Sequence, residues 1–292
     1  MNKLHFFGLI FFGLMIQSFA QKKETYTYAT KDNEELKFDI YYPDNFDQEK
    51  SFPALVWMHG GGFSGGIRDA HDETELVKTA AKKGYLGVTI SYRLTRKGTK
   101  EGVGCDCPLE IKKETFYKAS EDYLDAVSFL LKNQVKFKLD QNKIIAGGSS
   151  AGAEGILNAI YMKNEWFGKK FQNINFAGLF SLAGAAVKEA VLDNQNTIPA
   201  VFFHGAKDNV VPYETAPHHF CDKIKPGFMI LKGSKTLANF YKENQKSYFL
   251  FTSNNGQHEI SNIPFAYLDE VFKFFDLTVL NNKFQTVEIT VD

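Results

Sequence analysis

The feature that most constrains this chain is an apolar run that leads directly into a glycine-rich turn around a serine. Residues 144–147 read Ile-Ile-Ala-Gly, and residues 148–152 read Gly-Ser-Ser-Ala-Gly, which fits the pattern Gly-x-Ser-x-Gly. In this pattern a strand ends in a tight turn with the serine at its apex, and a helix follows at once. We therefore predict that Ser150 stands at a strand end and that a helix begins near Ala151. The pattern alone is weak, because glycine-rich turns also join strands to helices without any chemistry.

Apolar segments alternate with segments of helical periodicity along most of the chain. This alternation predicts an α/β fold, with a mostly parallel sheet covered by helices on both faces. Residues 24–29 and 36–42 alternate as a strand pair and predict an antiparallel N-terminal edge. Residues 284–291 favour a strand, but the sequence does not place it. The expected buried strands are residues 52–59, 87–92, 144–149, 176–183, 198–204 and 248–252, and the expected helices are residues 73–83, 120–133, 213–224, 234–244 and 263–281.

The first 20 residues have the layout of a cleavable export signal. A basic start at Lys3 precedes an apolar run over residues 4–16, and Ser18-Phe19-Ala20 supplies the small-x-small exit. The run is short for a membrane-spanning helix, and the alternative is a buried N-terminal helix. We expect residues 1–20 to be a signal peptide and residues 21–292 to be one catalytic domain, periplasmic or secreted.

Charge and cysteine content limit the binding partners, disulfides and metal sites that we expect. Lys and Arg number 34 and so do Asp and Glu, so neither nucleic acid nor an anionic membrane surface is an expected partner. Cys105 and Cys107 are too close for an unstrained bridge, and either one can pair with Cys221 in an oxidising compartment. A zinc site needs more ligands than these three thiols. We expect no metal and no cofactor, and the oligomeric state stays open.

A serine hydroxyl becomes a useful nucleophile only with a base beside it and an acid that orients the base. Asp208 follows the expected strand at residues 198–204, and His258 follows the one at residues 248–252. Both therefore lie beyond strand ends, where open α/β sheets build their sites. The chain order Ser150, Asp208, His258 is the order expected for this kind of serine turn. We predict that these three residues are a catalytic triad.

Other residues of the same types compete for these roles. An aspartate in Lys-Asp-Asn is often only a turn residue, and a histidine in a loop is often only a surface residue. The rival bases are His204, His218 and His219, and the rival acids are Glu154, Asp193 and Glu259.

A second motif, His59-Gly60-Gly61-Gly62-Phe63, follows an expected buried strand. Consecutive glycines leave backbone N–H groups unobstructed, so they can point at a developing oxyanion. We predict an oxyanion hole made by the N–H groups of Gly61, Gly62 and Ala151. His59 is expected to brace the loop.

Together these motifs resemble the α/β-hydrolase fold, and within it the hormone-sensitive-lipase-like and related bacterial carboxylesterases. Further matching segments are Ser91-Tyr92-Arg93-Leu94, Glu121-Asp122-Tyr123-Leu124-Asp125-Ala126, His204-Gly205-x-x-Asp208 and Gly256-Gln257-His258-Glu259. The resemblance implies hydrolysis of carboxylic esters through a covalent acyl-serine, without a metal. The sequence departs from the family pattern at Ser149, where many relatives have Asp, and at Glu154, where small residues are common. Only residues 21–51 precede the strand of the glycine loop, which leaves little or no cap domain.

The sequence therefore predicts a serine carboxylesterase acting on short acyl esters, with acetyl or feruloyl esters of polysaccharides as candidate substrates. An exported serine peptidase and an inactive binding protein on a hydrolase scaffold are the alternatives. Residues 93–115 show no periodicity and are expected to form a loop that walls or covers the cleft. The role of Glu154 and the natural substrate stay open.

Overall fold

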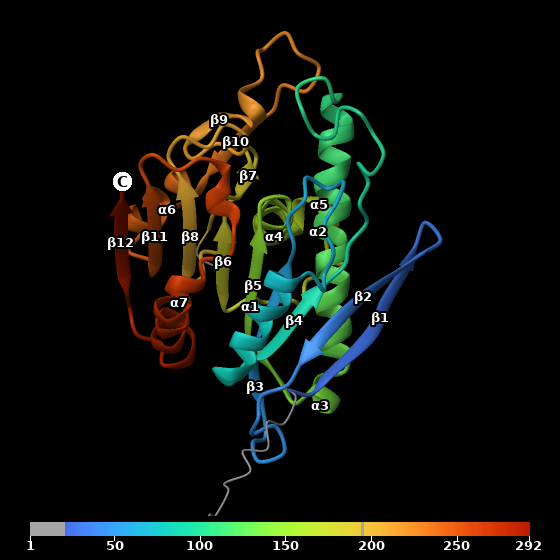
Figure 1. Ribbon diagram of the computed structural model, residues 1–292, viewed down its shortest axis with the longest axis vertical. Helices are drawn as coiled ribbons and strands as arrows, with labels where there is room; N and C mark the ends of the chain where they lie inside the picture. The colour runs from blue at the N-terminus through green and yellow to red at the C-terminus, as the bar shows by residue number, and fades with distance from the viewer. Residues whose placement is uncertain (1–20, 194–195) are drawn as a thin grey trace, which may run out of the picture.

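The computed structural model describes residues 21–193 and 196–292. The predicted signal peptide, residues 1–20, lies outside the described residues. Nine strands form one sheet in the order β1-β2-β4-β3-β5-β6-β8-β11-β12 (Figure 1). The strands are β1 (Lys23–Lys31), β2 (Glu34–Tyr41), β3 (Phe52–Met58), β4 (Leu86–Ile90), β5 (Leu139–Ser149), β6 (Gly178–Leu182), β8 (Ala200–Gly205), β11 (Tyr248–Ser253) and β12 (Thr286–Val291).

The sheet is parallel from β4 to β12, and only β1 and β2 run antiparallel to their neighbours. The β1–β2 hairpin turns at Asp32 and Asn33, which both have positive φ values, 53° and 63°. Two-residue hairpin loops need this conformation, and Asp and Asn tolerate it better than most residues. The predicted parallel sheet with an antiparallel N-terminal edge is confirmed.

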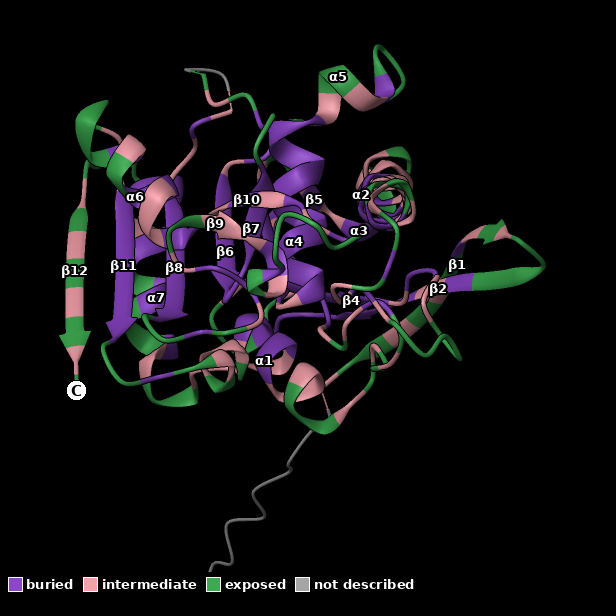
Figure 2. Cartoon of the chain, turned by 90° about the horizontal axis from the view of Figure 1, so that it is seen from above, coloured by how far each residue is buried: buried purple, intermediate pink, exposed green. Residues whose placement is uncertain are grey.

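Helices cover both faces of the sheet, and each face has its own apolar core (Figure 2). Side chains of α2 (Leu109–Lys132), α4 (Ala151–Tyr161) and α6 (Ser234–Glu243) fill one core. Side chains of α1 (His71–Lys82) and α7 (Leu268–Phe275) fill the other. The central strands are buried on both faces, which explains their continuous apolar sequences. The shorter helices are α3 (Gln134–Phe137), α5 (Lys163–Phe167), η1 (His218–Phe220), η2 (His258–Ser261), η3 (Phe265–Tyr267) and η4 (Asp276–Leu280).

The segment between β6 and α6 contributes a second, three-stranded sheet in the order β7-β10-β9. Its strands are β7 (Ala185–Val187), β9 (Thr215–Pro217) and β10 (Ile230–Gly233). None of the helices in the described part of the chain has the length and apolarity needed to cross a bilayer.

The helix predicted for residues 213–224 is wrong. β9 pairs with β10 there, and the 3₁₀ turn η1 follows with positive φ at His219 and Phe220. Pro217 has no N–H to donate to a helix. The N–H groups of His218 and His219 are donated instead to Met229 O, at 2.8 Å, and Val210 O, at 2.8 Å.

The loop predicted for residues 93–115 ends earlier, because α2 begins at Leu109. The sequence pattern did not predict the first turns of this helix because a lysine interrupts their apolar face. Lys112 is fully buried and donates from Nζ to Gly227 O at 2.7 Å. The β-prone tail, which the sequence did not place, is β12 and pairs in parallel with β11 at the sheet edge.

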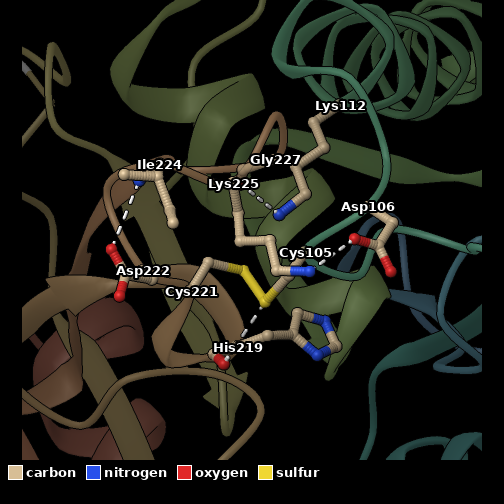
Figure 3. Close-up of a disulfide and its surroundings, with 9 residues drawn as sticks. All are labelled: Cys105, Asp106, Lys112, His219, Cys221, Asp222, Ile224, Lys225 and Gly227. Atoms are coloured by element: carbon tan, nitrogen blue, oxygen red, sulfur yellow. Dashed lines mark hydrogen bonds and ion pairs between the residues drawn. A yellow bond between two sulfur atoms is a disulfide. The ribbon is translucent and has the colours of Figure 1, made fainter.

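A disulfide joins Cys105 to Cys221, and the Cys107 thiol is free and buried (Figure 3). This resolves the pairing that the sequence left open. The bridge fastens the loop after β4 to the segment after η1, two stretches that Figure 1 shows side by side above the sheet. Backbone bonds reinforce it, since Gly227 N donates to Cys105 O at 2.9 Å and Leu109 N donates to Pro226 O at 2.9 Å.

We expect replacement of both bridge cysteines, Cys105→Ser with Cys221→Ser, to lower the free energy of unfolding by about 2–4 kcal/mol, because a cross-link over a long loop restricts the unfolded chain. Chemical denaturation under non-reducing conditions measures this. Cys107→Ser is the control, since it removes a thiol without removing a cross-link. An equal or larger loss in the control would contradict the assignment.

Candidate active site

Ser150 occupies a tight turn between β5 and α4 with φ 50° and ψ −120°. A positive φ at a non-glycine residue is strained and persists only where the surroundings enforce it. Ser150 N is fixed by donation to Leu182 O at 2.8 Å. A Cβ at Gly152 would lie 2.1 Å from Met58 O, so only glycine allows the start of α4 to lie against the end of β3. The helix begins at Ala151, as the sequence predicted.

Ser150, His258 and Asp208 form a continuous hydrogen-bonded chain. Ser150 Oγ lies 2.8 Å from His258 Nε2, and His258 Nδ1 lies 2.8 Å from Asp208 Oδ2. His258 begins η2 just beyond β11, and Asp208 lies in the turn after β8. The parallel strands β5, β8 and β11 therefore bring three residues that are distant in sequence to one edge of the sheet.

Asp208 is held from several sides. Its Oδ1 accepts from Val210 N at 2.8 Å and Val211 N at 3.0 Å. Burial alone would raise the pKa of Asp208, but hydrogen bonds and charge from His204 and His258 lower that pKa below its usual value. The aspartate is therefore ionised at neutral pH and is fixed as an acceptor for His258.

His204, a rival base in the sequence, contacts the acid and not the serine. Its Nε2 lies 3.1 Å from Val211 O and 3.3 Å from Asp208 Oδ2, and its Nδ1 lies 2.8 Å from Ser234 Oγ. The side chain is buried below Asp208 and braces it.

The rival acids do not take the place of Asp208 at His258 Nδ1. Asp193 lines a separate cavity, and Glu259 Oε1 accepts from Gln257 N at 2.9 Å. Glu154, His218 and His219 lie in the same cavity as Ser150, but none of their side chains is hydrogen-bonded to Ser150 Oγ. Among the described residues, only His258 therefore has the geometry of a base for Ser150.

The glycine loop lies against the serine turn. A Cβ at Gly60 would be 3.3 Å from Ser150 Cβ, and Gly61 and Gly62 have φ values of 116° and 61°. Within the described residues, the N–H groups of Gly61 and Gly62 have no hydrogen-bond acceptor. Ala151 is the first residue of α4, so its N–H has no partner within the helix. The three predicted donors thus line one cavity with Ser150.

His59 is positioned to hold this loop. Its Nδ1 donates to Gly60 O at 2.7 Å, and its ring packs on Tyr92 with 4.6 Å between centroids. Tyr92 in turn donates from its hydroxyl to His59 O at 3.1 Å. Burial lowers the pKa of His59, which keeps the imidazole neutral.

The cavity around Ser150 has a volume of about 510 Å³. Val103 from the loop after β4 lines the cavity, as predicted for that loop, whereas sequence reasoning missed the walls that come from α1 and from η1. The one signal in the sequence was a disulfide between Cys221 and the loop after β4, which would have placed η1 at the cavity. The residues that line the cavity are Gly60, Gly61, Gly62, Gly66, Glu73, Val103, Ser149, Ser150, Ala151, Glu154, Val210, Val211, His218, His219, His258, Ser261 and Asn262.

One group of acids elsewhere has spacing that would suit a cation: Glu121, Asp122 and Asp125 on α2. Lys31 contacts all three of them, and Arg93 pairs with Glu121 and Asp122. The carboxylates are thus already neutralised by side chains, and this cluster ties β1 and the end of β4 to α2.

Residues 38–180 match the BD-FAE family model. This match supports the α/β-hydrolase carboxylesterase resemblance that the sequence motifs predicted. The fold of the chain is similar to that of Thermogutta terrifontis esterase 2 phosphorylated by paraoxon, with a TM-score of 0.64 at 17% identity over 89% of this chain and 94% of that one.

Two sequence relatives match this chain over only part of their own length. The chain is 28% identical to ethyl acetate hydrolase of Pseudomonas putida over 124 residues, which are 42% of this chain and 34% of that protein. It is 31% identical to the non-reducing polyketide synthase mapC of Penicillium brevicompactum over 147 residues, which are 47% of this chain and 5% of that protein. The chain thus spans less than two thirds of the curated relatives it matches.

Glu73 on α1 lines the cavity, accepts a hydrogen bond from Trp57 Nε1, and has a pKa raised to about 7 by burial. A raised acid pKa contributes stability below the unfolded value, 4.5, and that contribution is lost as pH rises through 7. We expect Glu73→Gln to gain stability relative to wild type between pH 5 and pH 8, by about 2–3 kcal/mol. Denaturant unfolding at both pH values measures this difference.

The control is Glu75→Gln on the same helix. Lys78 lowers the pKa of Glu75, so this carboxylate is ionised at both pH values and its replacement adds no pH dependence. Equal behaviour of the two variants would contradict a buried, protonated Glu73.

Proposed function

We propose that this protein is a serine hydrolase of carboxylic esters that works through an acyl-enzyme on Ser150. The observation that carries the proposal is the hydrogen-bonded chain from Ser150 through His258 to Asp208, beside backbone N–H groups that lack acceptors. The family match and the ethyl acetate hydrolase relative support ester bonds as the target.

In the first half-reaction His258 Nε2 takes the proton from Ser150 Oγ as the oxygen attacks the ester carbonyl carbon. Asp208 holds the Nδ1 proton of His258 and stabilises the positive charge that forms on the imidazole. The negative charge on the former carbonyl oxygen is met by N–H groups of Gly61, Gly62 and Ala151, each typically worth about 3–4 kcal/mol of barrier. The C–O bond to the alcohol then breaks, and His258 gives its proton to the leaving alcohol.

The second half-reaction removes the acyl group. Water attacks the ester carbon while His258 Nε2 takes its proton, and a second oxyanion forms in the same hole. Collapse returns the proton to Ser150 Oγ and releases the carboxylic acid. No redox change occurs at any step.

For substrates, we propose short acyl esters, and acetyl or feruloyl esters of polysaccharides are the first to screen. The support is the BD-FAE match and, among the described residues, the presence of no more than a small three-stranded sheet beside the main one. The export layout of residues 1–20 and the Cys105–Cys221 bridge support a periplasmic or secreted enzyme that meets glycan esters outside the cytoplasm.

We expect Ser150→Ala to lose at least about 10⁴-fold in kcat/KM on p-nitrophenyl acetate, because the nucleophile is gone. The neighbouring Ser149→Ala is the matched control. Its kcat/KM should fall far less, since the Ser149 hydroxyl donates a hydrogen bond to Ser261 O at 2.7 Å. Steady-state kinetics of the folded variants measures both.

Ester turnover that survives in Ser150→Ala would contradict the assignment. A rate on peptide amides that rivals the ester rate would instead favour a peptidase. The absence of turnover on both esters and peptide amides by wild type would leave only a binding function.

A further inference from the structure

The cavity around Ser150 contains a second set of buried polar side chains that ester hydrolysis does not use. Glu154 lies on α4 one turn beyond Ser150, and its N–H is donated to Ser150 O at 2.9 Å. His218 and His219 reach the same cavity from η1. The set therefore lies beside the reacting atoms but outside the hydrogen-bonded chain of Ser150.

Glu154 and His218 are buried, His219 is half-buried, and each has a buried polar atom that is not hydrogen-bonded to any described residue. Glu154 is 2% exposed and His218 is 1% exposed, and Glu154 Oε1 lies 3.3 Å from His218 Nε2. Glu154 Oε1, His218 Nδ1 and His219 Nε2 have no hydrogen-bond partner among the described residues. Leaving a buried polar atom unpaired costs free energy, so such atoms are rare in folded proteins. Three of them around one cavity indicate that a ligand completes their bonds.

The charge state of the set indicates the kind of ligand. Burial raises the pKa of Glu154 well above its usual value, and it lowers the pKa values of His218 and His219, that of His219 to about 4. The titratable groups nearby are Lys112, Asp208 and His258. A protonated carboxyl and a neutral imidazole each offer both a donor and an acceptor. A hydroxyl group, which also donates and accepts, matches them better than an ion.

The histidines are rigidly held, as a recognition site requires. His219 has a positive φ of 54°, and Cys221 of the Cys105–Cys221 bridge follows two residues later, with Cys105 Sγ 3.9 Å from His219 O (Figure 3). Lys112 Nζ reaches across to Gly227 O and ties the same segment to α2. The disulfide therefore fastens this wall of the cavity opposite α4.

We propose that Glu154, His218 and His219 form a specificity subsite that hydrogen-bonds a hydroxyl group of the substrate close to the scissile ester. This rests on the proposed function, and it adds that the enzyme favours hydroxylated esters over plain ones. The hydroxyl belongs to either the acyl or the alcohol part, and matched substrate pairs distinguish the two.

The test measures kcat/KM for two pairs of esters. Methyl 3-hydroxybutyrate against methyl butyrate places the hydroxyl on the acyl part, and 2,3-dihydroxypropyl acetate against propyl acetate places it on the alcohol part. We expect wild type to prefer the hydroxylated member of one pair. Glu154→Leu and His218→Phe should each reduce that preference about tenfold, the effect of one lost hydrogen bond. The ratio of two rates does not depend on how much of a variant is folded.

Two further variants separate recognition from a structural role. Glu154→Gln keeps a donor and an acceptor and should retain most of the preference, while Glu110→Gln, exposed on α2, should leave it unchanged. A wild-type enzyme without preference in either pair, or subsite variants that keep the preference, would overturn the subsite while leaving ester hydrolysis intact.

If wild type turns over no ester, the proposed function fails, and binding decides the subsite. The binding of 2,3-dihydroxypropyl acetate to Ser150→Ala is then measured by ligand-observed NMR. The double variant that also carries Glu154→Leu should bind this ester about tenfold more weakly. Unchanged binding would overturn the inference.

Discussion

The structure depends on one tight turn, in which the backbone is forced into a positive φ at Ser150 between β5 and α4. This conformation is costly for a serine, and it is maintained by the bond from Ser150 N to Leu182 O and by the contact of Gly152 with Met58 O. Those contacts require β3, β5 and β6 to be adjacent and parallel. The sheet thus stabilises the strained turn that places the half-buried Ser150 hydroxyl in the cavity.

The walls around that turn come from elements that are far apart in sequence and are held by separate devices. The glycine loop is braced by His59 and Tyr92, and the acid loop is braced by His204 under Asp208. The Cys105–Cys221 bridge fastens the remaining wall, which carries His218 and His219. Preorganisation of this kind lets a site meet developing charge without rearranging. It also leaves Glu154 and the two histidines with unpaired polar atoms beside the serine, which is why we assign them to substrate recognition.

The sequence predicted what depends on short motifs and on strand order. Ser150, Asp208 and His258 each follow a buried strand, so a parallel sheet had to bring them to one edge. Prediction from the sequence failed where tertiary contacts override the local pattern. Residues 213–224 form β9 and a 3₁₀ turn because β10 and Val210 take their N–H groups, and the start of α2 was hidden by the buried Lys112. His218 was considered only as a rival base, and Glu154 as a rival acid and a departure from the family with an open role, since nothing local shows that two distant segments share one cavity.

The most direct test of the account is covalent labelling of the serine by an organophosphate such as paraoxon, read out by mass spectrometry of the digested protein. Attack on phosphorus needs the same activated hydroxyl as attack on an ester carbonyl. We predict one adduct, on Ser150. A His258→Ala variant that retains the fold should form almost none. An adduct on another residue, or labelling of Ser150 that is as fast without His258 as with it, would contradict the central claim.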